Sequence, residues 1–222
     1  MGKLGLKSRQ IEILTKDEIE EIHLTTLDLL EHVGVVVREE EALTILGEAG
    51  CSVNMRKKLV KFPSSLIEEA IRLAPKGFTL YARNPRNNVK VGDGVHFQPM
   101  IGRLNIIDLN GEKRRTTLRD LANLTKVADA MENYALLHSG AMMPHIEGVP
   151  DQAAHVYGYL AGVMNSEKVI KGTGRGRDKA HDCIKMASVL AGGEEEMRKN
   201  PNIFTTTNPV SPLQHDRIQM EG

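Results

Sequence analysis

The sequence predicts an α/β fold of the (β/α)₈ TIM-barrel type, of which its 222 residues supply about the first half. The first observation is spacing: the β-prone runs that begin at Tyr134, Lys168 and Asn202 are 34 residues apart each time. Helical patterns fill the intervals, and a strand–helix–strand unit takes about 30 residues or more, so these strands are expected to be parallel. The second observation is length. Eight such units need about 270 residues, whereas residues 95–222 supply 128.

A doubly wound sheet accounts for the same alternation of strands and helices. An open parallel sheet of four strands would however leave two bare edges, which proteins usually cover. The final residues also read as a strand, an Asn208-Pro-Val-Ser-Pro212 loop and the start of a helix, a unit interrupted at Gly222. We therefore expect the chain to be the N-terminal part of a longer barrel.

Residues 1–77 are expected to form a helical cap. Thr15-Lys-Asp-Glu18 is a capping-box pattern that starts a helix, and Gly34 is a natural end for it. A second helix is predicted over residues 40–48, and a third runs from Pro63 to Leu73.

Residues 78–116 are predicted to hold β-hairpins and the first barrel strand. The β-prone runs, separated by turn signals such as Asn110-Gly111, are Phe78–Tyr81, Val89–Val91, Val95–Phe97 and Leu104–Asp108.

Residues 117–222 are predicted to form the βα units of the partial barrel. The expected helices cover residues 118–131, 151–164 and 178–190, and the expected strands cover 134–139, 168–172 and 202–207. Residues 194–200 are expected to be a charged surface turn.

Composition excludes several functional classes. Lys plus Arg and Asp plus Glu both number 29, so the chain lacks the basic excess of a nucleic-acid or membrane-surface binder. No run is long enough for a transmembrane helix, and Met1–Gln10 lacks the apolar core of a signal peptide. Two distant cysteines, Cys51 and Cys183, exclude a disulfide scaffold. A cytoplasmic protein is the simplest expectation.

The layout resembles the trimethylamine methyltransferase (MttB-type) family of corrinoid-dependent methyltransferases. The likeness extends over about residues 12–216. It is carried by Leu14–Gly34 with Glu-His-Val-Gly-Val, Glu41-Ala-Leu to Gly50-Cys51, Lys61-Phe-Pro, Ala74-Pro to Arg83, Leu118-Arg-Asp-Leu-Ala, Gly192–Pro201 and, most strongly, Thr207-Asn-Pro-Val-Ser-Pro-Leu213. The chain departs from the family at Gln98-Pro-Met-Ile-Gly102, where relatives tend to have a Gly-rich turn.

The resemblance implies a (β/α)₈ barrel about twice this length. It implies a methyltransferase of methylamine metabolism and methanogenesis, which moves a methyl group from trimethylamine or a betaine-type quaternary amine to a corrinoid (cobalamin) protein. Some members carry pyrrolysine at a position beyond Gly222, so its presence is undecided. The 222-residue chain alone is expected to be inactive, and its bare sheet edges predict a homo-oligomer.

Barrel active sites lie at the carboxyl ends of the strands. Alternation places Lys171 on the same strand face as Val169 and Thr173, and we expect this face to point into the barrel, because the opposite face meets the apolar helices. The candidate substrate-binding residues are Gln98, His138, Lys171, Thr173, Thr206, Asn208 and Ser211. The catalytic group is not assigned.

Four of these candidates also have a structural explanation. His138 is also explained as a hydrogen-bonded core histidine, Lys171 as an ion-pair partner inside the barrel, and the Asn208–Ser211 loop as a stop and turn. No metal site is expected, because no histidine pair has helical i,i+4 spacing and neither cysteine lies in a ligand cluster.

Two other functions remain open. One is a non-catalytic half-barrel that assembles with another chain or with itself. The other is a barrel enzyme that binds a phosphate ligand through the Gly172–Arg177 loop, whose glycines and two arginines suit an anion.

Overall fold

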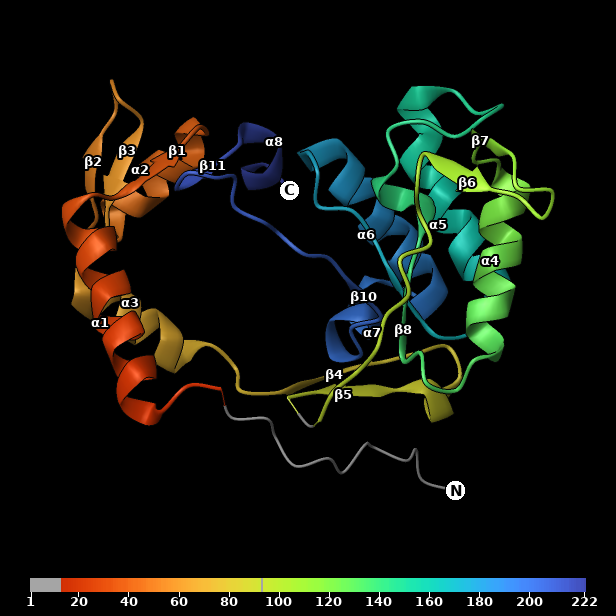
Figure 1. The fold of residues 1–222 in the computed structure, drawn as a ribbon, viewed down its shortest axis with the longest axis horizontal. Helices are drawn as coiled ribbons and strands as arrows, with labels where there is room; N and C mark the ends of the chain where they lie inside the picture. Colours follow the sequence, from red (N-terminus) through yellow and green to blue (C-terminus); the bar gives the residue numbers. More distant parts are fainter. Residues whose placement is uncertain (1–12, 93) are drawn as a thin grey trace. The chain divides into compact units, whose positions relative to one another are not determined.

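The computed structural model describes residues 13–92 and 94–222 (Figure 1). The segment Met1–Gln10, which is expected not to be a signal peptide, and Asp93 lie outside the described residues. The described chain forms two compact units. One is Gly77–Thr206, and the other combines residues 13–76 with Thr207–Glu221.

The second unit packs helices on a small sheet. Its helices are α1 (Lys16–His32), α2 (Glu40–Glu48), α3 (Ser64–Leu73) and the short α8 (Arg217–Met220). The strands, in the order in which they pair, are β11 (Gln214–His215), β1 (Val35–Val37), β3 (Leu59–Lys61) and β2 (Ser52–Asn54). The predicted capping box is confirmed: the Glu18 amide donates to Thr15 Oγ1 at 3.2 Å, and the Thr15 amide donates to Glu18 Oε2 at 2.7 Å.

The sheet in this unit was not predicted. Its strands have two or three residues, too few for an alternating pattern to show, and the pairing of β1 with β11 joins residues far apart in sequence. Gly34 is required where α1 turns into β1, because its φ is +82° and a Cβ atom there would collide with the Val60 carbonyl oxygen. Val37, Leu43 and Val60 form the core between sheet and helices.

The first unit begins with two antiparallel hairpins, as the sequence predicts. Strand β4 (Phe78–Leu80) pairs with β5 (Val89–Val91), and β6 (Asn105–Ile107) pairs with β7 (Lys113–Arg115). The second hairpin turns at Gly111, whose φ is +83°. The predicted strand at Val95–Phe97 makes a parallel bridge from Phe97 to Tyr134 instead of a hairpin.

A parallel sheet follows in the same unit. Its strands are β8 (Leu136–His138), β9 (Val169–Lys171) and β10 (Ile203–Phe204). They pair in the order β10-β9-β8, and the Phe97–Tyr134 bridge adjoins the start of β8, so neighbours in space follow the order of the chain. This order is what the start of a (β/α)₈ barrel requires, but the described sheet is open, and the barrel remains a prediction.

Helices alternate with these strands (Figure 1). They are α4 (Leu118–Ala130), α5 (Ala154–Asn165), α6 (Arg177–Ala191) and α7 (Glu194–Lys199), with 3₁₀ turns η1 (Pro85–Asn87), η2 (Gly140–Met142) and η3 (Asp151–Ala153). The expected charged turn at residues 194–200 is a helix. Acidic residues in its first turn and basic residues in its last favour the helix dipole, and Lys199 pairs with Glu196 at 2.8 Å.

The two faces of the parallel sheet pack against different partners. Leu137 and Ile170 belong to a core shared with residues of α4, α5 and α6. Leu136 and Val169, the alternate residues, pack with the β4–β5 hairpin. Because side chains alternate along a strand, His138 and Lys171 lie on the face away from the helices, as the alternation predicts. In the described part of the chain, no helix has the length and apolar character needed to cross a membrane.

Candidate functional site

Two titratable side chains lie side by side at the carboxyl ends of the parallel strands. His138 is the last residue of β8, Lys171 is the last residue of β9, and the two are direct partners in the strand register. Thr206 follows β10, and Lys171 Nζ donates a hydrogen bond to Thr206 Oγ1 at 2.6 Å. The structure thus brings together three of the predicted site residues.

Lys171 is a buried cation. The residue is only 7% exposed, and burial lowers the pKa of its ammonium group. Among the residues that the structure describes, its side-chain partner is the Thr206 hydroxyl, and no carboxylate lies within ion-pair distance. The sequence also allowed Lys171 to act as an ion-pair partner. Within this part of the chain the structure shows no such ion pair.

His138 is buried beside this cation. Its Nδ1 atom lies 2.8 Å from the Ser139 carbonyl oxygen, which can only accept, so Nδ1 carries the proton. Burial lowers the pKa of His138, the positive charge of Lys171 lowers it further, and Arg103 adds to the effect. The imidazole is therefore neutral near pH 7 and presents an unprotonated Nε2 atom.

Ser139 connects the ends of the two strands. Its hydroxyl donates to the Lys171 carbonyl oxygen at 2.7 Å and accepts from the Ala141 amide at 3.0 Å. The loop then passes against α5 at Gly140. A Cβ atom on Gly158 would lie 2.8 Å from Gly140 Cα and closer still to the Gly140 carbonyl group, so this approach requires glycine. The close packing fixes the loop that follows His138.

The loop after β9 is folded on itself. The Gly172 amide donates to the Phe204 carbonyl oxygen at 3.0 Å, and Thr173 is buried and accepts from the Arg175 amide at 3.2 Å. These bonds lie in the Gly172–Arg177 loop, which the sequence suggested as an anion site. The Arg175 amide of that loop already has an acceptor in Thr173.

Three predicted site residues are not part of the Lys171 group. Gln98 follows the Phe97 bridge and is exposed, with no hydrogen bond to His138, Lys171 or Thr206 in the described structure. Asn208 and Ser211 are exposed and belong to the other unit, with residues 13–76. Their roles stay predictions.

Sequence reasoning missed Ser139 and Arg103. The signal for Ser139 was its place at the end of a predicted strand, directly before Gly140. Arg103 acts through its charge and carries no motif, so only the folded chain reveals it.

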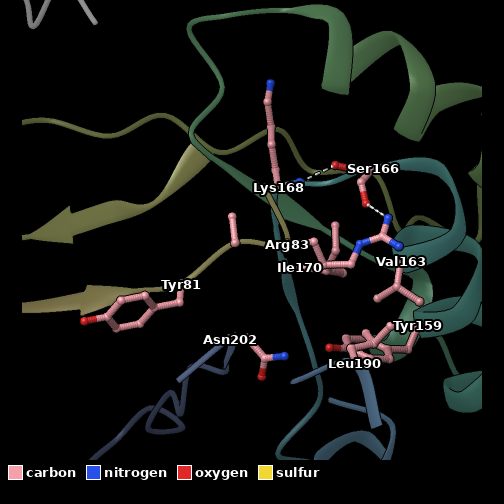
Figure 2. Close-up of a pocket in the computed structure, with 10 residues that line it drawn as sticks. Tyr81, Arg83, Tyr159, Val163, Ser166, Lys168, Ile170, Leu190 and Asn202 are labelled. Carbon is pink, nitrogen blue, oxygen red and sulfur yellow. Dashed lines mark hydrogen bonds between the residues drawn. The ribbon is translucent and has the colours of Figure 1, made fainter. Parts of the chain in front are cut away.

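A small pocket lies at the opposite, amino ends of the strands (Figure 2). Lys168 and Asn202, which line it, precede β9 and β10, and Tyr159 contributes from α5. Arg83 donates to the Ser166 carbonyl oxygen at 2.5 Å, and this bond ties the β4–β5 region to the start of β9. In (β/α)₈ barrels the active site lies at the carboxyl ends of the strands, and the amino ends contribute to stability. Within the described residues, no group of His, Cys, Asp and Glu side chains could hold a metal ion.

Comparison with known proteins gives concordant matches. The family model for trimethylamine methyltransferase (MTTB) matches residues 3–222. Glycine betaine methyltransferase from Desulfitobacterium hafniense (strain Y51) is 34% identical over 217 residues, which is 97% of this chain and 44% of that protein.

Two proteins named trimethylamine methyltransferase MttB are also similar. The one from Desulfitobacterium hafniense (strain DSM 10664 / DCB-2) is 35% identical over 207 residues, 89% of this chain and 40% of that protein. The one from Methanosarcina barkeri is 29% identical over 219 residues, 96% of this chain and 44% of that protein. The chain spans less than half the length of these relatives.

Proposed function

Because the chain belongs to the trimethylamine methyltransferase family, we propose that it forms part of an enzyme that transfers a methyl group from a methylated amine to a corrinoid protein. The observation that carries the proposal is the His138–Lys171–Thr206 group at the carboxyl ends of consecutive parallel strands. In (β/α)₈ barrels the active site lies at that end. We propose that the described sheet is the first part of such a barrel.

The reaction is a displacement at carbon. The bond between the methyl carbon and nitrogen breaks, its electron pair stays on the departing amine, and the corrinoid acceptor supplies the pair for the new bond. Such a transfer asks the protein chiefly to hold donor and acceptor in line. A quaternary amine leaves as a neutral amine and requires no proton at the moment of transfer.

The charge states of the site suit a positioning role. His138 is neutral, since burial and the Lys171 charge both lower its pKa, so it adds no positive charge next to a cationic amine. Lys171 and Thr206 supply hydrogen-bond donors, and Ser139 holds the two strand ends in register. These residues would bind and orient the substrate.

Spectroscopy of the corrinoid tests the proposal. The protein encoded by the complete reading frame that contains this sequence is mixed with a reduced corrinoid protein and a panel of methylated amines. We expect conversion to the methylated corrinoid with at least one amine. The Lys171→Met variant should be slower, and Lys126→Met, at an exposed position of α4, should match the parent. Failure of every amine to methylate the corrinoid would overturn the proposal.

A further inference from the structure

The β4–β5 hairpin covers the face of the parallel sheet that carries His138 and Lys171, on the side of the amino ends of the strands. We propose that this hairpin is the floor of the candidate site. Leu80 and Val89 are then positioning residues for the two side chains above them, and a ligand reaches the site from the carboxyl ends. The inference rests on the proposed function where it concerns methyl transfer, whereas the floor itself can be tested without a substrate.

The hairpin meets the sheet with its apolar face. Leu80 and Val89 are cross-strand partners and are only 3% and 1% exposed. They form one core cluster with Val169 of β9, and Leu136 of β8 packs against that cluster. Thr79, the preceding residue of β4, lies on the opposite face of the hairpin, because successive side chains of a strand alternate.

The residues that the hairpin contacts lie directly beneath the site. Leu136 is two positions before His138, and Val169 is two positions before Lys171, so each pair shares a strand face at a spacing of about 6–7 Å along the strand. Phe204, the register partner of Lys171 on β10, also packs against the hairpin cluster. One layer of apolar side chains therefore separates the hairpin from the two titratable groups.

Hydrogen bonds tie the hairpin region to the amino ends of the strands. The Tyr81 amide donates to the carbonyl oxygen of Pro201, shortly before β10, at 2.8 Å. Arg83 donates to the carbonyl oxygen of Ser166, shortly before β9 (Figure 2). All these contacts are made between described residues, so they do not depend on any further strands. The hairpin is a fixed support and not a lid.

Thiol labelling tests the floor. Val169→Cys places a thiol in the layer beneath Lys171, and the two cysteines of the described chain are buried. In the protein of the complete reading frame, a charged thiol reagent should label Val169→Cys far more slowly than Lys126→Cys, at an exposed position of α4. Adding Leu80→Ala should accelerate labelling of Val169→Cys by at least about tenfold, because it removes packing from the floor. Adding Thr79→Ala should not.

NMR titration of His138 tests the positioning role. Burial is the main cause of its lowered pKa, so Leu80→Ala and the milder Val89→Ala should raise that pKa toward its ordinary value. Val60→Ala is the matched control, since Val60 is equally buried in a three-residue strand of the other unit. It should weaken resistance to urea as Val89→Ala does and leave the His138 titration unchanged. The two hairpin variants should also slow methyl transfer by about tenfold or more, because displaced groups lose alignment.

Two sets of results would overturn the inference. Labelling of Val169→Cys as fast as Lys126→Cys would show that the hairpin does not close this side. A His138 pKa that is unchanged in the folded hairpin variants, or raised equally by Val60→Ala, would refute the positioning role. A shielded thiol and a shifted His138 pKa, in a protein that methylates no corrinoid with any amine, would support the floor and refute the proposed function.

Discussion

Burial of His138 against Lys171 makes the ionisation of the histidine depend on its neighbour. Burial is the larger cause of its lowered pKa, and the Lys171 charge is the next. Replacing Lys171 by Met removes the second cause and keeps the first. We expect the His138 pKa to rise in Lys171→Met and to remain below its ordinary value of about 6.5. Titration of the histidine ring by NMR measures this, and an unchanged pKa would show that the two side chains do not interact.

The lowered pKa of His138 also makes the stability of the protein depend on pH. When the folded-state pKa of a histidine is lowered, the unfolded chain takes up the proton first as the pH falls, so the free energy of unfolding decreases. The decrease begins near the unfolded pKa and continues down to the folded one. Urea unfolding between pH 7.5 and 5 should show a smaller loss in His138→Asn than in the parent. Equal slopes would contradict a lowered pKa at His138.

Gly158 provides a residue-level test of the loop that follows His138. An added methyl group would run into the Gly140 backbone, so Gly158→Ala should destabilise the protein by about 1–3 kcal/mol, as overpacking does. Gly47 is the matched control: it also lies inside a helix, but a Cβ atom there meets only Val53 Cγ2 at 3.6 Å. Gly47→Ala should be neutral or stabilise by up to about 1 kcal/mol. Chemical denaturation compares the two, and equal effects would refute the close approach.

Among the described helices that alternate with the parallel strands, α4 has the best-defined start. Thr117 and Asp120 form a capping box, and Arg114 Nη1 and Nη2 donate to the two oxygens of Asp120 at 2.7 and 2.9 Å. These bonds hold the pKa of Asp120 well below its usual range. Thr117→Ala should cost about 1 kcal/mol, whereas Thr117→Ser keeps the hydroxyl and should cost less. Equal losses in urea unfolding would show that the hydroxyl is not what stabilises the helix.

Elements with a local signal could be predicted from the sequence, and elements held by distant pairing could not. The capping pattern at Thr15 marks a helix start that the structure shares, and the helix predicted from residue 118 begins at Leu118 as α4. Strand β11 has two residues and forms only because β1 offers an edge. His138, Lys171 and Thr206 could be predicted as site residues because each lies at or just after the end of a strand that has a local sequence signal. The roles of Ser139 and Arg103 depend on contacts between segments, which a single sequence does not show.

In the parallel sheet, each βα unit adds one strand next to the strand of the previous unit. Phe97, β8, β9 and β10 follow each other in space as in sequence, so the ends of β8 and β9 and the segment after β10 place His138, Lys171 and Thr206 one after the other. This is why residues 35 positions apart, Lys171 and Thr206, share a hydrogen bond. A doubly wound sheet reverses its strand order at one point, and no reversal occurs among these described strands.

The last segment of the chain completes the N-terminal unit. Strand β11 pairs in parallel with β1, the Val36 amide donates to the Leu213 carbonyl at 2.9 Å, and the Arg38 amide donates to the His215 carbonyl at 3.1 Å. Arg38 also donates through Nε and Nη2 to Gln214 Oε1, at 3.2 and 2.8 Å. Residues 207–221 therefore cover an edge of the sheet that would otherwise be open.

Removing the segment after Thr206 tests this role. Without β11 the Val36 and Arg38 amides lose their acceptors, so they should exchange with solvent faster. Hydrogen exchange followed by NMR or mass spectrometry measures the change. The internal control is the Val37 amide, which donates to the Lys58 carbonyl at 2.8 Å and should keep its protection as long as the unit stays folded. Unchanged exchange at both Val36 and Arg38 would show that β11 does not protect β1. Loss of protection at all three amides would show instead that residues 207–221 are needed for the unit to fold.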